Sequence, residues 1–292
     1  MTAVTATPRS LRIPVGRVTL RCLEWGAPSG FPVVLLHGLR GHAHSWDDVA
    51  AELGKTYRVI AVDQRGRGES DWAPDGDYSM EAFSEDTAGL CNALGLDAIA
   101  LIGHSMGGRN GILFSSRFPE RVSAFVLVDV GPEVDPQGAA RIRDEVVKAP
   151  ERFDSLEDAV VAACQENPLA DVNIIRRRLE FQTMPHRDGG ITWRYDPLVR
   201  EQVRTNTRAK PPDLWEMWRR IQCPILIVRG TETDVLSPAI LRRMTAMQPR
   251  CELAEIARAG HMVFEDNPPA FLRVAGSWLR DSSKVRTTVR SR

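Results

Sequence analysis

The chain lacks the features that mark several classes of protein. Its 38 Lys and Arg residues balance 38 Asp and Glu residues, so no net charge is available to attract nucleic acid or an anionic membrane. No run reaches the roughly 18 apolar residues of a membrane-spanning helix. The N-terminal segment MTAVTATPRSLRIPVG also lacks the apolar stretch of a secretory signal. We therefore expect a cytoplasmic protein that acts on a small molecule, with no nucleic-acid or membrane partner; the sequence does not indicate its oligomeric state.

Paired cysteines are missing too. The five cysteines stand singly, at Cys22, Cys91, Cys164, Cys223 and Cys251, with no C-x-x-C pair of the kind that binds zinc or exchanges disulfides. This pattern favours a reducing compartment. The pair His42-x-His44 is not completed to a metal-ligand set, so we expect neither a metal nor a cofactor.

The 292 residues, 43% of them hydrophobic, are sufficient for one large core. Short β-branched segments recur along the chain with helical patterns between most of them: LRIPV, VTLRCLEW, PVVLLH, YRVIAVD, AIALIGH, VSAFVLVDV, PILIVRG and CELAEIA. Several are apolar at every position, as strands covered on both faces must be. The pattern predicts a doubly wound, mostly parallel eight-stranded α/β sheet, with the first two segments forming an antiparallel hairpin at one edge.

This alternation stops between residues 132 and 220. Trp, Arg and helical patterns such as VNIIRRRLEFQ replace the apolar strands there, and the strand–helix rhythm resumes after Cys223. We therefore predict a main domain built from residues 1–131 and 221–292, and an inserted, mostly helical segment at 132–220. Insertions at strand ends are tolerated because extra loop length costs little closure entropy.

A candidate nucleophile lies in the string Gly103-His104-Ser105-Met106-Gly107. It follows the apolar run AIALI and precedes a helical pattern, which is the strand-to-helix context that G-x-S-x-G requires. Small residues two before and two after the serine permit a tight turn that lifts its hydroxyl clear of the sheet. The helix N-terminus that follows favours negative charge at the reacting centre.

With this turn in place, the chain resembles the α/β-hydrolase superfamily, in its serine carboxylic-ester hydrolase-like branch with a helical cap. Three further segments carry the resemblance. His37-Gly38 through Gly41 to Trp46 looks like an H-G-x-x-G-x-x-x-x-W loop, and residues 63–70 resemble a D-x-R-G-x-G-x-S turn of architectural role. Residues 231–238 and Ala259-Gly260-His261 resemble the segments that carry the acid and the histidine.

The resemblance implies a catalytic Ser105, with His261 as its base. Asp234 is the favoured acid because it stands four residues before Pro238, as in the family's D-x-x-x-P spacing. Three residues separate Gly230 from Asp234 where relatives commonly have two, so Glu232 remains a rival. Asp129, at the end of VSAFVLVD, occupies the other position from which some relatives supply the acid.

The resemblance also implies an oxyanion hole made of two backbone N–H groups, those of Leu39 and Met106. The inserted segment is expected to lie over Ser105 and to shape the substrate pocket. Its candidate apolar lining residues are Phe181, Met184, Trp193, Trp215, Met217 and Trp218. Arg40, Trp46 and His104 are further candidates for contact with the substrate.

A serine nucleophile implies an acyl-enzyme. We expect hydrolysis of a small or medium, largely apolar carboxylic ester or lactone. The alternatives are a thioesterase or acyltransferase, a carbon–carbon bond hydrolase of a dienoic keto-acid, and a non-enzymatic ligand receptor on the same fold. His104 stands where carbon–carbon hydrolases often have asparagine, which makes that alternative less favoured.

Overall fold

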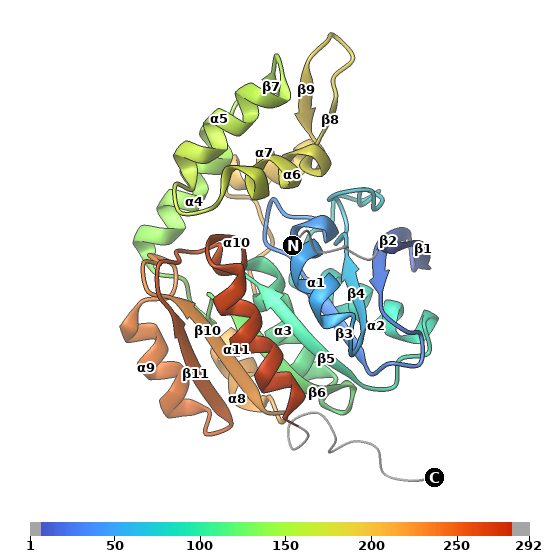
Figure 1. The fold of residues 1–292 in the computed structure, drawn as a ribbon, viewed down its shortest axis with the longest axis vertical. Coiled ribbons are helices and arrows are strands. Elements are labelled where there is room, and N and C mark those ends of the chain that lie inside the picture. Colours follow the sequence, from blue (N-terminus) through green and yellow to red (C-terminus); the bar gives the residue numbers. More distant parts are fainter. Residues whose placement is uncertain (1–6, 282–292) are drawn as a thin grey trace.

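The chain folds around one large sheet covered by helices on both faces (Figure 1). The structure, a computed structural model, describes residues 7–281. Eight strands form the sheet in the order β1-β2-β4-β3-β5-β6-β10-β11. Their bounds are β1 Arg9–Val15, β2 Val18–Trp25, β3 Pro32–Leu36, β4 Arg58–Val62, β5 Ile99–His104, β6 Val122–Val128, β10 Ile225–Gly230 and β11 Cys251–Ile256. Strand β2 runs antiparallel to β1 and to β4, and the remaining neighbours are parallel.

The helices that follow the strands cover the two faces of the sheet. They are η1 Ala43–Trp46, α1 Asp47–Leu53, α2 Met80–Ala93, α3 Met106–Arg117, η2 Pro119–Arg121, α8 Leu214–Arg220, α9 Pro238–Met247, α10 Val263–Asp266 and α11 Pro268–Arg280. Alternate residues of a strand serve opposite faces, since Val34 and Leu36 belong to one apolar core and Val33 and Leu35 to the other. Helices α2, α3, α8 and α9 close the first core, and α1, α10 and α11 close the second.

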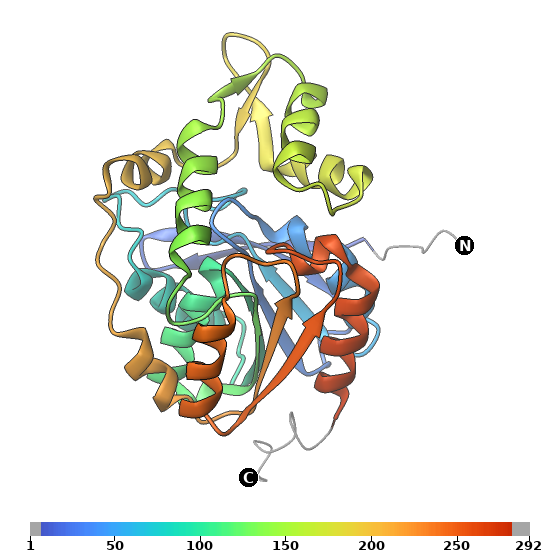
Figure 2. The ribbon, with the colours of Figure 1, turned by 90° about the vertical axis from the view of Figure 1, so that its left-hand side faces the viewer.

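A second group of elements stands beyond the carboxyl ends of the parallel strands (Figures 1 and 2). It comprises α4 Pro136–Lys148, β7 Arg152–Phe153, α5 Leu156–Glu166, α6 Val172–Gln182, β8 Thr183–Pro185, β9 Ile191–Trp193 and α7 Pro197–Thr205. These elements have their own apolar core around Ile175, Leu179 and Trp193. Backbone hydrogen bonds from Gly68 to Arg194 and from Asp196 to Gly66 tie this group to the main domain.

The insertion differs from its sequence description in two respects. Strands β7, β9 and β8 form a small antiparallel sheet that was not expected. The predicted insertion at 132–220 includes helix α8, but this helix packs on α3 of the main domain. Its Leu214 and Trp218 belong to the first of the two cores of the large sheet. Figure 2 shows α8 low against the main domain, well away from the insertion.

The predicted eight-stranded, mostly parallel sheet with its antiparallel edge hairpin is confirmed. Within residues 7–281, no helix is both long and apolar enough to span a membrane. Residues 1–6 of the segment searched for a secretory signal lie outside the described residues.

Candidate active site

Ser105 lies on a very tight turn between β5 and α3. Its φ of +52° falls in the left-handed region, which L-residues rarely adopt and which is typical of strained functional turns. Gly107 makes the turn possible, because a Cβ there would collide with the carbonyl oxygens of Leu36 and His37. The turn places Ser105 at the carboxyl edge of the parallel strands, where open α/β sheets form their sites.

His261 connects Ser105 to a buried carboxylate. Its Nε2 lies 2.9 Å from Ser105 Oγ, and its Nδ1 lies 2.9 Å from Asp129 Oδ2. An ionised carboxylate only accepts hydrogen bonds, so Nδ1 must carry the ring proton. Nε2 is then free to accept the Ser105 proton, as a general base must.

Asp129 is held rigidly in this position. It follows β6, adopts a φ of +48° and is fully buried. Besides His261, its carboxylate accepts hydrogen bonds from the Thr233 hydroxyl at 2.6 Å and from the Gly230 backbone N–H at 3.1 Å. Three donors converge on one buried anion and fix its orientation toward the imidazole.

The preference for Asp234 as the acid is therefore corrected by the geometry. Its carboxylate accepts two hydrogen bonds from Arg141 of α4, at 2.6 and 2.7 Å, and that guanidinium lowers the pKa of Asp234. Glu232, the other rival, has an exposed side chain, and its backbone N–H donates to Ala259. Of the three carboxylates, only Asp129 contacts His261.

The loop that follows β3 approaches Ser105 closely. A Cβ on Gly38 would lie 3.2 Å from the Ser105 Cβ and 2.9 Å from His104 Nδ1, so only glycine fits. Within the described residues, the backbone N–H groups of Leu39 and Met106 donate to no backbone carbonyl, which leaves both available for a developing oxyanion. Arg67 links the two segments, since its Nε donates to the Leu39 carbonyl and its Nη2 reaches the Met106 sulfur.

Buried polar groups support this loop. His37 Nδ1 bonds the Gly38 carbonyl at 2.7 Å, and its Nε2 accepts the Gln64 N–H at 3.0 Å. Burial lowers the pKa of His37 to about 3, so the ring is neutral and its two nitrogens have fixed roles. Asp63 accepts the N–H of Ala43 and of Glu69, and Arg65 pairs with Asp86, in keeping with the architectural role assigned to that turn.

The comparison with known families agrees with this fold and this arrangement of residues. The sequence pattern of the alpha/beta hydrolase fold family matches residues 32–268. The chain belongs to the alpha/beta hydrolase fold family.

Individual members of the family resemble the chain over most of its length. It is 29% identical over 273 residues to 2-(acetamidomethylene)succinate hydrolase of Mesorhizobium japonicum, covering 92% of this chain and 95% of that protein. An esterase of Mycobacterium tuberculosis is 29% identical over 280 residues, covering 91% and 88%. The crystal structure of E-2-(acetamidomethylene)succinate hydrolase superposes with a TM-score of 0.85 at 27% identity, covering 93% and 99%.

Two cavities meet at Ser105 of this hydrolase. One, of about 400 Å³, lies on the side of His261 and Asp234, and the other, of about 560 Å³, on the side of Met106 and Arg109. Leu39, Ser105 and Ile142 line both. The insertion contributes to each cavity, α4 and α6 to the first and α4 and α7 to the second.

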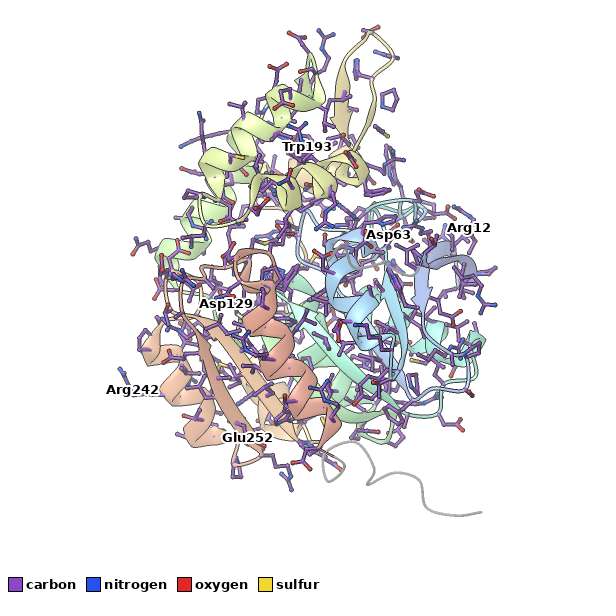
Figure 3. All side chains as sticks on the ribbon, in the orientation of Figure 1. Arg12, Asp63, Asp129, Trp193, Arg242 and Glu252 are labelled. Carbon is purple, nitrogen blue, oxygen red and sulfur yellow. The ribbon has the colours of Figure 1, made fainter. Side chains whose placement is uncertain are left out.

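Three aromatic residues expected in the substrate pocket lie elsewhere. Trp46 is fully buried and stacks on Phe264, and Trp193 packs inside the insertion. Trp215 is on α8, where the guanidinium of Arg243 lies over its ring. Figure 3 shows Trp193 high in the insertion, well above Asp129. None of the three lines either cavity beside Ser105. An amphipathic aromatic ring packs readily into the core of a small lobe, which is the role that Trp193 takes.

The other expected aromatic and methionine candidates, Phe181, Met184, Met217 and Trp218, also lie outside these two cavities. Phe181 stacks on His44, and Trp218 is fully buried beneath α3.

Arg40 and His104 do line the cavity on the His261 side. Arg40 pairs with Glu166 at 2.8 Å and lies 3.4 Å from Glu145, so its charge is already neutralised. His104 is buried, which holds its pKa well below the usual value, and its Nε2 bonds the His261 carbonyl at 2.9 Å. His104 thus positions the backbone of His261.

No group of three or more metal-ligating side chains occurs within residues 7–281.

Proposed function

We propose that this protein is a serine hydrolase that cleaves a carboxylic ester through an acyl-enzyme. The observation that supports this most strongly is the line of contacts from Ser105 Oγ through His261 to Asp129, with 2.9 Å on either side of the imidazole. A buried carboxylate, a histidine of fixed tautomer and a serine on a strained turn together activate a hydroxyl that is otherwise a weak nucleophile.

Each step of the proposed reaction has a group in place. Ser105 Oγ attacks the acyl carbon while His261 Nε2 takes its proton, and the N–H groups of Leu39 and Met106 receive the negative charge that develops on the acyl oxygen. Collapse of the tetrahedral intermediate expels the leaving alkoxide, which takes the proton from His261. His261 Nε2 then takes a proton from water as the water attacks the acyl carbon, and it returns that proton to Ser105 Oγ as the acid leaves.

The two cavities suit a substrate with a group on each side of the scissile bond. Ser105 stands where they meet, so the acyl and alcohol parts can occupy different cavities. Similarity to an esterase supports an ester as the substrate, and the other relative, a hydrolase of a succinate derivative, supports acyl hydrolysis more broadly.

The test is turnover of short-chain esters and lactones together with covalent labelling by a fluorophosphonate. Wild-type protein should hydrolyse at least one ester and be labelled stoichiometrically, while Ser105→Ala should do neither. Failure of the wild type to be labelled would overturn the proposal.

The same assays separate the alternatives. Turnover of thioesters without esters would favour a thioesterase, and turnover of a dienoic keto-acid with esters untouched would favour a carbon–carbon bond hydrolase. Tight binding of a ligand that persists in Ser105→Ala, with no turnover of that ligand by the wild type, would favour a receptor.

A further inference from the structure

The cavity on the Met106 side of Ser105 is strongly positive. Its lining includes four cationic side chains, those of Arg67, Arg109, Arg208 and Lys210, and no Asp or Glu. The cavity on the His261 side is different, because its cations are offset by Glu145, Glu166, Glu232 and Asp234. A cation-lined cleft with low-dielectric walls concentrates anions.

Arg109 is the central cation of this cavity. It lies on α3 four residues after Ser105, its backbone N–H donates to the Ser105 carbonyl, and both residues line the cavity. Its Nε is buried without any hydrogen-bond partner, and within residues 7–281 it forms no salt bridge. Burial lowers the pKa of Arg109, and the charge of Arg208 lowers it further.

Arg67 has a different position in the same wall. Its guanidinium donates to the carbonyls of Leu39 and Arg65 and lies over the rings of Tyr78 and Phe83. Burial lowers the pKa of Arg67 to about 10, although the group remains charged at neutral pH. Arg67 therefore adds positive potential, while its hydrogen bonds are committed to the protein.

Arg109 differs in this respect from three other arginines of the chain. Arg40, Arg65 and Arg141, which are also partly buried near the site, each pair with one or more carboxylates. Arg208 and Lys210, in the segment after α7, have no such partner among the described residues and face the same cavity as Arg109. A buried cation without a partner is destabilising, and a bound anion would compensate for it.

We infer that this cavity binds a carboxylate carried by the substrate, with Arg109 as its main partner and Arg208 and Lys210 supplying further charge. The inference rests on the proposed function and narrows its substrate class. One helical turn separates Arg109 from Ser105, about 6 Å along the axis. The carboxylate is therefore a few bonds from the reacting acyl carbon, with a short apolar spacer against Ile142, Val130 and Val134.

A substrate that carries a carboxylate differs from the largely apolar substrate that the sequence predicts. That expectation followed from the zero net charge of the whole chain, whereas the charge near Ser105 is unbalanced. A planar guanidinium binds a carboxylate with two parallel hydrogen bonds. One similar protein is named for a succinate derivative, and succinate is a dicarboxylate.

The test compares esters that differ in charge alone. Monoethyl succinate and ethyl levulinate have the same carbon skeleton near the ester, but a methyl ketone replaces the carboxylate in the second. A second pair, 3-acetoxypropanoate and 4-acetoxybutan-2-one, places the same difference in the leaving alcohol. Wild-type kcat/KM should favour the anion by about 10- to 100-fold in at least one pair, as expected for hydrogen bonds to a charged group.

Variants then assign the preference to the cavity. Arg109→Met should reduce the anion-to-neutral ratio of kcat/KM toward one, mainly through KM, and Arg109→Lys should keep part of it. The matched control is Arg242→Met on the outer helix α9, which Figure 3 shows far from Asp129 and which should leave the ratio unchanged. Arg109→Met should also unfold at the same or a higher urea concentration, because a merely structural arginine would instead lower it.

The outcomes distinguish this inference from the proposed function. A wild type that is labelled by fluorophosphonate and hydrolyses the neutral esters as well as both anions overturns the carboxylate site and leaves the hydrolase intact. The same holds if the preference survives in Arg109→Met and in the double variant Arg208→Gln/Lys210→Gln. If no ester is hydrolysed, binding of succinate to Ser105→Ala, weakened at least tenfold by Arg109→Met, decides the question, and equal or absent binding overturns the inference.

Discussion

The Nδ1 atom of His261 lies 2.9 Å from Oδ2 of Asp129, at the end of β6, while Asp234 on the loop after β10 pairs with Arg141. We therefore expect removal of the two carboxylates to have different effects on kcat. Asp129 fixes the tautomer of His261, the proposed general base, and Asp234 connects the loop to α4 of the insertion.

Asp129→Asn should lower kcat by about 10⁴-fold, the loss that follows when a triad histidine is held in the wrong tautomer. The side-chain NH2 of asparagine would donate a hydrogen bond to Nδ1, so the ring proton would lie on Nε2. A protonated Nε2 cannot accept the proton of Ser105. Steady-state kinetics on the best ester, with circular dichroism to verify folding, measures this.

Asp234→Asn is the matched control, since it makes the same chemical change in the neighbouring loop. We expect a loss in kcat of less than tenfold. The assignment of Asp129 is wrong if the two variants exchange these effects.

The proposed oxyanion donors are backbone groups, so we expect the identity of the Leu39 side chain to matter less than its N–H. Leu39→Ala should keep kcat within a few-fold, whereas Leu39→Pro, which lacks the N–H, should lower kcat by about 10²–10³-fold with a smaller change in KM. Equal kcat values for the two variants, at comparable stability, would show that this N–H takes no part.

Because His37 is buried in its neutral form, the folded protein should become less stable relative to the unfolded chain in mild acid. Burial lowers the pKa of His37 to about 3 in the folded protein, below its value of about 6.5 in the unfolded chain. Between these values the unfolded state binds the proton and the folded state does not, so stability falls as pH decreases. The loss from this one residue is about 2 kcal/mol between pH 7 and pH 5.

Urea unfolding at pH 5 and pH 7 measures this effect. His37→Gln keeps a side-chain acceptor but cannot titrate, so the difference in free energy of unfolding between the two pH values should shrink by about 2 kcal/mol. His186→Gln, at a partly exposed position in the insertion, is the control and should change it little. If His37→Gln leaves the difference in free energy of unfolding between pH 5 and pH 7 unchanged, His37 is not the source of the acid sensitivity.

Much of the fold follows from local sequence patterns. Segments such as VVLL and ILIV are apolar at every position, which indicates central parallel strands, and G-x-S-x-G between a strand and a helix identifies the turn at Ser105. The strands of the insertion were missed because they have only two or three residues each, too few for a period to show.

The sequence does contain a sign that Asp234 differs from the acid of the family pattern. Three residues instead of two separate Gly230 from Asp234. In the structure the Thr233 hydroxyl donates to Asp129, while Asp234 pairs with Arg141. The contact itself depends on the turn at Asp129 and on the packing of β6 beside β10, which no local pattern specifies.

The positive cavity could not be read from the sequence either. Arg109 and Arg208 are far apart in the chain, although both line the same cavity. The net charge of the whole chain is zero, so it does not indicate a local excess of positive charge. The hydrophobic pattern placed Arg109 on a helix, but whether a neighbouring carboxylate pairs with it is a tertiary property.

The proposed reaction depends on acylation of Ser105, which rapid quenching can detect. A p-nitrophenyl ester is mixed with the protein, the reaction is stopped in acid within its first turnovers, and the peptides are examined by mass spectrometry. We expect an acyl mass on the peptide that contains Ser105 of the wild type and none on the corresponding peptide of Ser105→Ala. Turnover of the ester by the wild type with no acyl group on Ser105, or with one on another residue, would contradict it.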